Sequence, residues 1–216
     1  MKKIIFSFAM MLLAFNANAQ GVVEKLTVYN EFRPAVVHLS SGRDIKNQFT
    51  NIFLKNASLL FKQGVNTMEA NMETIAGVDF DDHKYVKIEK MLACQLDTVG
   101  QNALYCATVI DIPAYEQMLR NNVNLTNFSL FDASTSDQMS YTSIDLQDDV
   151  QMPLVNHYFF RLNGKFVKAH DRELSRMLSK EQKRRMKTIM ATDSFSWMDR
   201  DSLVRLLKAI SSVQGE

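Results

Sequence analysis

The chain has 216 residues and a formal net charge of +1 at pH 7, and 46% of its residues are hydrophobic. This near-neutral balance indicates no particular class of partner, and a total of seven glycines argues against Gly-rich phosphate-binding loops. The length is sufficient for one sizeable core, or for one domain with an appendage.

The N-terminus has the three parts of a secretory signal peptide. Residues 1–3 are a short basic start, residues 4–15 are an apolar run, and Ala17 and Ala19 place small residues at the spacing of a cleavage site. A transmembrane anchor would need roughly 20 apolar residues, and this run is shorter. We therefore predict a signal peptide over residues 1–19, cleavage near Ala19, no membrane span, and a periplasmic or secreted mature chain.

Residues 20–169 are predicted to form a β-rich body. Short stretches rich in β-branched and aromatic residues alternate with turn residues, and one helix is expected over residues 113–122, where Pro113 occupies the first turn. The expected strands cover residues 35–39, 44–49, 51–55, 58–63, 67–72, 77–80, 84–88, 89–96, 103–110, 122–131 and 141–146.

The only two cysteines lie in two of these strands. Folding the hairpin about Gly100 places Cys94 opposite Cys106 and Leu96 opposite Leu104. Opposed residues of antiparallel strands are close enough to be bridged, and an exported chain meets oxidising conditions. We predict a structural disulfide, with free buried thiols as the alternative. Redox or zinc chemistry is disfavoured, because eleven residues separate the cysteines and no histidine is near in sequence.

The C-terminal residues 170–216 are predicted to form three short helices. Asn163 and Gly164 suit a tight hairpin turn, after which the apolar period changes from two to about 3.6. Asp171 and Asp199 are predicted N-caps, and Ser179 with Gln182 is a predicted capping box. So short a segment lacks a core of its own. The expected fold is α+β: an antiparallel β sandwich or open barrel with these helices packed on it.

This order of segments resembles a group of secreted bacterial proteins of unknown function. The resemblance rests on the signal peptide, the glycine-turn strand pair "AVVHLSSGRDIKN", and "YFFRLNGKFVKA" leading into Lys-rich helices that end in "DSLVRLLKAI". It implies a β region with a small C-terminal helical tail, and it implies no activity.

Asp79, Asp81, Asp82 and His83 form the densest polar cluster. Carboxylates with a histidine are suited to a divalent metal or to acid–base catalysis, which makes a metal-dependent hydrolase one hypothesis. The alternative is a solvated turn between two strands. No nucleophile elbow, zinc-protease motif or phosphate loop is present, so we assign no catalytic residue and expect no cofactor.

The strongest charge run is "SKEQKRRMK", in which Lys183, Arg184 and Arg185 are candidates for binding an anion or a membrane surface. Interleaved aromatic residues, expected for single-stranded nucleic acid, are absent. The alternative is a solvated face, or a face docked on the β body, because residues 20–164 carry 11 basic and 17 acidic groups while residues 165–216 carry 12 and 7.

These observations favour an exported, non-enzymatic module that binds a protein or an envelope glycan, with the hydrolase and the anion-binding protein as alternatives. Asp97-Thr98-Val99 and Asp201-Ser202-Leu203 also resemble the O-glycosylation sites of some exporting bacteria, and Thr98 is the better placed of the two hydroxyls.

Overall fold

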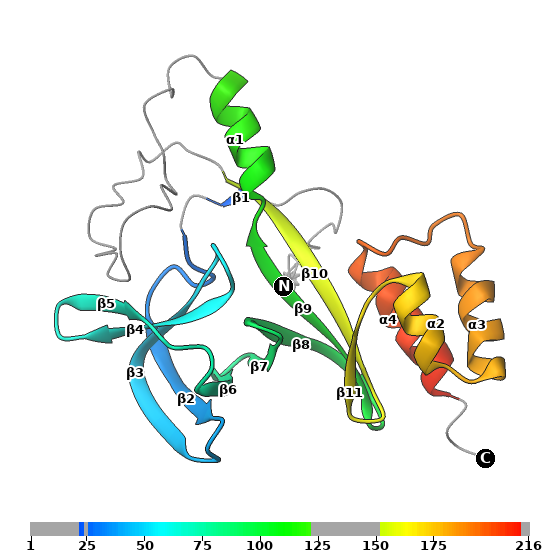
Figure 1. The fold of residues 1–216 in the computed structure, drawn as a ribbon, viewed down its shortest axis with the longest axis horizontal. Coiled ribbons are helices and arrows are strands. Elements are labelled where there is room, and N and C mark those ends of the chain that lie inside the picture. Colours follow the sequence, from blue (N-terminus) through cyan, green and yellow to red (C-terminus); the bar gives the residue numbers. More distant parts are fainter. Residues whose placement is uncertain (1–21, 24–25, 122–151, 213–216) are drawn as a thin grey trace, which may run out of the picture.

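The computed structural model describes residues 22–23, 26–121 and 152–212, and its main feature is one antiparallel sheet of eleven strands. The strand order is β1-β10-β9-β8-β7-β6-β2-β3-β4-β5, and β11 pairs with β10 (Figure 1). The strands are β1 (Val22–Val23), β2 (Arg33–Leu39), β3 (Asp44–Phe53), β4 (Ser58–Gln63), β5 (Asn66–Glu69), β6 (Ile75–Asp79), β7 (Lys84–Ile88), β8 (Met91–Val99), β9 (Asn102–Ile110), β10 (Met152–Leu162) and β11 (Lys165–Lys168).

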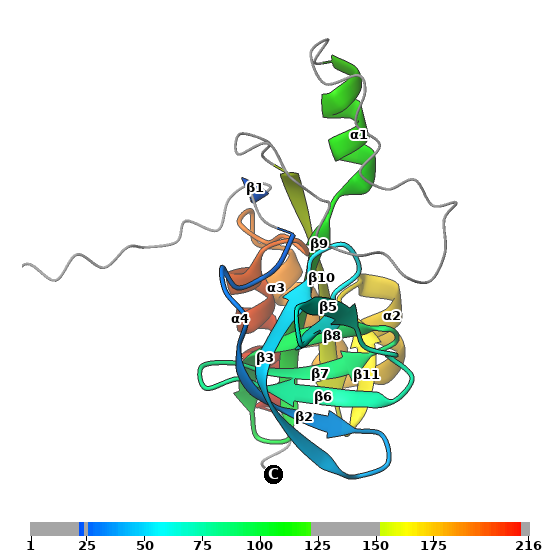
Figure 2. The same ribbon diagram turned by 90° about the vertical axis from the view of Figure 1, so that its left-hand side faces the viewer.

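Four helices accompany the sheet, three of them at the C-terminal end. They are α1 (Ile112–Asn121), α2 (Asp171–Met177), α3 (Lys180–Met190) and α4 (Arg200–Ser211). Helix α1 continues from the end of β9 and projects from the body, whereas α2, α3 and α4 gather beside β8 to β11 (Figure 1). Seen from the side, these three helices lie behind the strands β2, β6 and β7 (Figure 2).

The sheet curls far enough for its distant parts to meet. The amide of Ile110 in β9 donates to the carbonyl of Leu54, at 2.7 Å, and the amide of Leu92 in β8 donates to the carbonyl of Ala57, at 2.8 Å. Both carbonyls belong to the turn between β3 and β4, and β4 is separated from β8 by four strands in the sheet order. The β body is therefore one curled, open sheet, and it is not the pair of stacked sheets that defines a sandwich.

Strand β9 is buried on both faces. Leu104 and Cys106 on one face share a core with the helices α2, α3 and α4. Tyr105 and Ala107 on the other face pack in a second core with Phe159 of β10. Because the helices share their core with β9 and β10, their apolar stripes are covered by the sheet, as their short length requires.

The N-terminal ends of α2, α3 and α4 can be compared with the predicted caps. The Ser179 hydroxyl accepts from the Gln182 amide and the Gln182 side chain accepts from the Ser179 amide, which confirms the capping box. The Asp199 side chain accepts from the Ser202 amide, which confirms the second N-cap. The prediction for Asp171 was wrong: His170 is the N-cap residue of α2 without a side-chain bond, and Asp171 accepts from the Ser175 hydroxyl inside the helix.

The predicted α+β fold is confirmed, with an antiparallel β-rich body and three C-terminal helices. The helix expected over residues 113–122 is present as α1, and the Asn163-Gly164 turn has positive φ at both residues, as a tight hairpin turn requires. The strands predicted over residues 122–131 and 141–146, and the signal peptide over residues 1–19, lie outside the described residues.

Strand β3 has two neighbours along only part of its length. Its residues 50–53 pair with β4, whereas residues 44–47 pair with β2 alone among the described strands. The pairing with β2 shifts between Arg33 and Ala35, so β3 carries a bulge at this point. Ile45 and Phe49 lie along this half of β3 and are 47% and 55% exposed.

A methyl group at Gly77 is expected to destabilise the sheet. A Cβ atom there would lie 2.6 Å from the carbonyl oxygen of Tyr85 in β7, and backbone cannot move away as a side chain can. We expect Gly77→Ala to lower the free energy of unfolding by about 1–3 kcal/mol, measured by urea denaturation. Ala76→Ser, at the exposed neighbouring position, is the control, and equal midpoints for the two variants would contradict this account.

Candidate functional site

The two cysteines face each other across β8 and β9, as predicted. Cys94 pairs with Cys106, but the pairing nearer the turn differs from the prediction: Asp97 is opposite Leu104, and Leu96 falls in a bulge. The turn between β8 and β9 contains two residues, Gly100 and Gln101, whereas the predicted hairpin had Gly100 alone at its centre. The extra residue at Leu96 compensates for the longer turn and restores the register at Cys94.

The structure has both cysteines as free thiols, so it does not contain the predicted disulfide. Cys94 is half-buried and Cys106 is buried. Burial raises the pKa of each thiol to about 11, so that neither is a thiolate at neutral pH. This environment suits structural thiols and is unlike that of a catalytic cysteine, whose pKa is lowered.

The cysteine pair lies where two cores meet. Cys106 belongs to the core shared with the helices, and Cys94 packs against the core formed by β2 to β8. Tyr85 of β7 is opposite Cys94, and Tyr158 of β10 is opposite Cys106. The row from Tyr85 to Tyr158 therefore crosses four strands on one face of the sheet.

Asp82 in the turn between β6 and β7 is paired within the chain. Its carboxylate lies 2.9 Å from Nη1 of Arg33 and 3.2 Å from Nδ1 of His83. The hydrogen bond from Arg33, followed by that from His83, lowers the pKa of Asp82 to about 2. The Arg33 guanidinium also lies over the Tyr29 ring, 4.5 Å from its centroid. Asp82 thus fastens the start of β2 to this turn.

Asp79 takes part in a different group of charges. The His38 ring lies with Nδ1 2.7 Å from Asp44 and Nε2 3.5 Å from Asp79, while Lys84 Nζ lies 3.3 Å from the second Asp79 oxygen. The hydrogen bond with Asp44 is the main cause that raises the pKa of His38. Carboxylates at both ring nitrogens favour the doubly protonated imidazolium.

The structure does not bring the four candidate metal ligands together. Asp82 and His83 contact each other, Asp79 belongs to the His38 group, and Asp81 is exposed. Over residues 26–121 and 152–212, no group of three or more His, Cys, Asp or Glu side chains is arranged to hold a metal ion. The observed partners of Asp79 and Asp82 are cations, histidines and the Tyr29 hydroxyl of the chain itself.

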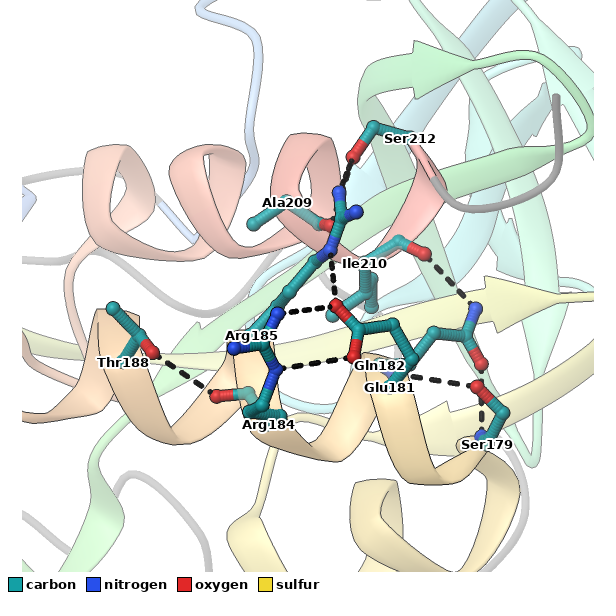
Figure 3. Close-up of polar contacts among 9 residues, drawn as sticks. All are labelled: Ser179, Glu181, Gln182, Arg184, Arg185, Thr188, Ala209, Ile210 and Ser212. Atoms are coloured by element: carbon teal, nitrogen blue, oxygen red, sulfur yellow. Dashed lines mark hydrogen bonds and ion pairs between the residues drawn. The ribbon is translucent and has the colours of Figure 1, made fainter. Parts of the chain in front are cut away.

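The predicted anion-binding residues lie on α3, which packs against α4 (Figure 3). Arg184 donates to both carboxylate oxygens of Glu181, at 3.0 and 2.9 Å, and Arg185 donates to Glu181 and to the Ser212 hydroxyl. The hydrogen bonds from Arg184 and then Arg185 lower the pKa of Glu181 to about 2. Of the three candidates, only Lys183 lies exposed with no ion pair among the described residues.

The cations of α3 face solvent. Lys180, Lys183, Arg184 and Lys187 are exposed, and their spacing of three and four residues places them on one side of the helix. Met186 on the opposite side is buried in the shared core, with Ile189 and Met190 packed against it. The alternative that this basic face docks on the acidic body of the same chain is therefore wrong.

Two bonds fix the orientation of this cationic face. Gln182 Nε2 donates to the carbonyl of Ile210 at 2.9 Å, and Arg185 Nη1 donates to Ser212 Oγ at 2.6 Å (Figure 3). Both join α3 to the last turn of α4. The exposed lysines therefore lie on a helix whose position is fixed by the packing of its apolar side and by these two hydrogen bonds.

The two hydroxyls of the glycosylation-like motifs differ in exposure. Thr98 is exposed beside the turn between β8 and β9. The Ser202 hydroxyl is buried and bonded to Asp199 and to the carbonyl of Ser194. Only Thr98 is accessible to a modifying enzyme.

Sequence reasoning missed three residues of these clusters. The sequence analysis assigned His38 to no cluster, although the turn at residues 40–43 predicts that it faces Asp44. Arg33 and Tyr29 meet Asp82 across 49 and 53 residues of sequence, and no local pattern indicates such a contact.

The chain matches no protein-family model, no curated protein and no solved structure. None of the helices in the described part of the chain combines the length and the hydropathy that crossing a membrane requires.

His38 is expected to make stability depend on pH. Its folded pKa is raised above the unfolded value, so its contribution is fully present below about pH 6.5 and is lost as pH rises through the folded pKa. His38→Asn should lower the free energy of unfolding by about 0.2–1 kcal/mol at pH 5.5 and by less at pH 8.5, measured by urea denaturation. His157→Asn, at an exposed histidine of β10, is the control. A cost that is equal at both pH values would contradict the ion-pair account.

Proposed function

We propose that this chain is an exported, non-enzymatic binding module, and that the cationic face of α3 binds an anionic glycan of the cell envelope. We define this face by its four exposed cations, Lys180, Lys183, Arg184 and Lys187. The observation that carries the proposal is the contrast between these lysines and the acidic clusters. Asp79, Asp82 and Glu181 are each paired with cations of the chain, whereas the three lysines have no ion pair among the described residues.

The apolar side of α3 favours a glycan over a membrane surface. A helix that lies on a membrane buries its apolar side among the lipids. In α3 that side is occupied, because Met186 is fully buried in the shared core. The exposed face offers three ammonium groups that have no ion pair among the described residues, and the Arg184 guanidinium, which is paired with Glu181. These cations are spaced along about 10 Å of helix. Such a row suits a linear polyanion that carries carboxylate or sulfate groups.

The hydrolase alternative receives less support. Asp82 and His83 contact each other, but Asp79 belongs to a separate group, and within residues 26–121 and 152–212 no third ligand joins Asp82 and His83. The thiols are protonated at neutral pH because burial raises their pKa values to about 11. The resemblance to secreted bacterial proteins and the three-part N-terminus support export.

Export predicts a defined N-terminus. The protein purified from its own host should have an intact mass that begins at Gln20, because the cleavage site follows Ala19. Intact-mass spectrometry without reductant also reports any glycan at Thr98. A mass that begins at Met1 would contradict the signal peptide, and it would leave the binding test below unaffected.

The binding face is tested by removing its charge. The triple variant Lys180→Gln, Lys183→Gln and Lys187→Gln should bind immobilised heparin, a model anionic glycan, roughly a hundredfold more weakly, at about 1 kcal/mol for each lysine. The matched control removes three exposed lysines of the β body, Lys62, Lys90 and Lys165, with the same change in net charge.

The two triple variants separate a specific face from general charge. Equal weakening in both would show that net charge alone sets retention, and unchanged binding in the α3 variant would overturn the proposal. Binding to phosphatidylglycerol vesicles that exceeds binding to heparin would replace the glycan by a membrane surface.

A further inference from the structure

The unequal burial of Cys94 and Cys106 predicts which of the two cysteines reacts first with a reagent from solvent. The two residues are direct partners in an antiparallel ladder, in which opposed residues lie about 4.5–5.5 Å apart. This separation lies within the range that a disulfide spans. Cys94 is half-buried whereas Cys106 is 8% exposed, so Cys94 is the more accessible of the two residues to a reagent from solvent.

Burial is the largest effect on the Cys94 thiol and raises its pKa to about 11, and two neighbouring groups partly offset this rise. The Tyr85 hydroxyl forms a hydrogen bond with the Cys94 thiol, and this bond lowers the pKa of the thiol. Tyr85 is held in turn by Tyr29, with 3.4 Å between the two hydroxyl oxygens. Arg200, the first residue of α4, adds a positive charge that acts on both thiols in the same direction. A cation near a thiol favours the reactive thiolate.

We propose that the pair is an oxidation site with a fixed order, in which Cys94 reacts first with a disulfide-bearing oxidant and Cys106 completes the bond. The oxidant is a thiol–disulfide exchange partner, either a small disulfide or the disulfide of an oxidoreductase. This inference does not depend on the proposed function, because it concerns the folded chain and any such oxidant.

The exchange proceeds in two balanced steps. The Cys94 thiol loses its proton to solvent, and its sulfur attacks one sulfur of the oxidant; the other sulfur leaves as a thiolate and takes up a proton. The Cys106 thiol then loses its proton and attacks the Cys94 sulfur, and the second half of the oxidant leaves as a thiol. The two cysteines are oxidised to one disulfide, and the oxidant disulfide is reduced to two thiols.

The reduced, folded protein is mixed with glutathione disulfide, and samples are quenched with acid for intact-mass analysis. In Cys106→Ser, Cys94 should acquire one glutathionyl group at least about tenfold faster than Cys106 acquires it in Cys94→Ser, because only an accessible thiolate reacts. The wild type should lose two protons and retain no glutathione. In urea the two variants should react at equal rates.

Two results would overturn the proposal. One is equal reactivity of the two single variants in the folded state, and the other is a wild type that keeps both thiols or carries glutathione on each. Cys106→Ala and Cys94→Ala, compared by near-ultraviolet circular dichroism, replace the serine variants if these do not fold.

Arg200 provides a second test that leaves the cysteines intact. Arg200→Gln should slow the first step about threefold, as expected for one screened charge, and the slowing should decrease at high salt. The control is Arg172→Gln, at an exposed arginine of α2. Equal rates for these two variants would remove Arg200 from the mechanism, whereas the order of the cysteines is tested separately by the exchange with glutathione disulfide.

Discussion

Strand β9 must satisfy two cores at once, and the positions of most other elements follow from this constraint. Leu104 and Cys106 pack under the C-terminal helices, while Tyr105 and Ala107 pack on the opposite face. A slip of one residue would exchange these two sets, because successive side chains of a strand point to opposite faces. The register of β9 against β8 and β10 is therefore fixed by packing on both faces. The residues of β9 that fix this register also form the core against which the C-terminal helices pack.

The charged side chains of the described residues are of two kinds: some form pairs that join segments of the fold, and others are exposed and can contact a partner. The first kind includes Arg33 with Asp82 and His38 with Asp44, and these pairs join segments of the β body. Arg185 also belongs to this kind, since it joins α3 to Ser212. The lysines of α3 belong to the second kind. Because the helix is held by Met186 and Gln182, substitution of its exposed lysines changes the surface and leaves the core intact.

Much of this architecture could be predicted because it rests on local patterns. The alternation of residues around Gly100, the Asn163-Gly164 turn and the Ser179–Gln182 capping box each lie within a few residues of sequence, where period and turn chemistry are informative. The facing of Cys94 and Cys106 followed from the same reasoning, although the bulge at Leu96 was not foreseen. A bulge depends on packing from both faces of the strand, and the sequence of one hairpin does not contain that information.

The contacts that could not be predicted join distant segments. Arg33 meets Asp82 only because the sheet places β2 beside β6, and that neighbourhood follows from a strand order that a single sequence leaves open. The same limitation explains why docking of the basic helix on the acidic body could be offered as an alternative to a solvated face. Net charge predicted attraction between the two parts, whereas the apolar side of α3 decided which face turns inward. Burial of apolar area outweighed the weak attraction between exposed charges.

The half of β3 that β4 does not cover has a consequence for the behaviour of the chain at high concentration. Backbone groups along an unpaired strand edge are a template for another strand. Among the described strands this half of β3 has such an edge, and Ile45 and Phe49 add exposed apolar area beside it. Lys46 and the bulge before Thr50 are features that natural sheets use to discourage such pairing. A neutral residue at position 46 would therefore favour edge-to-edge assembly.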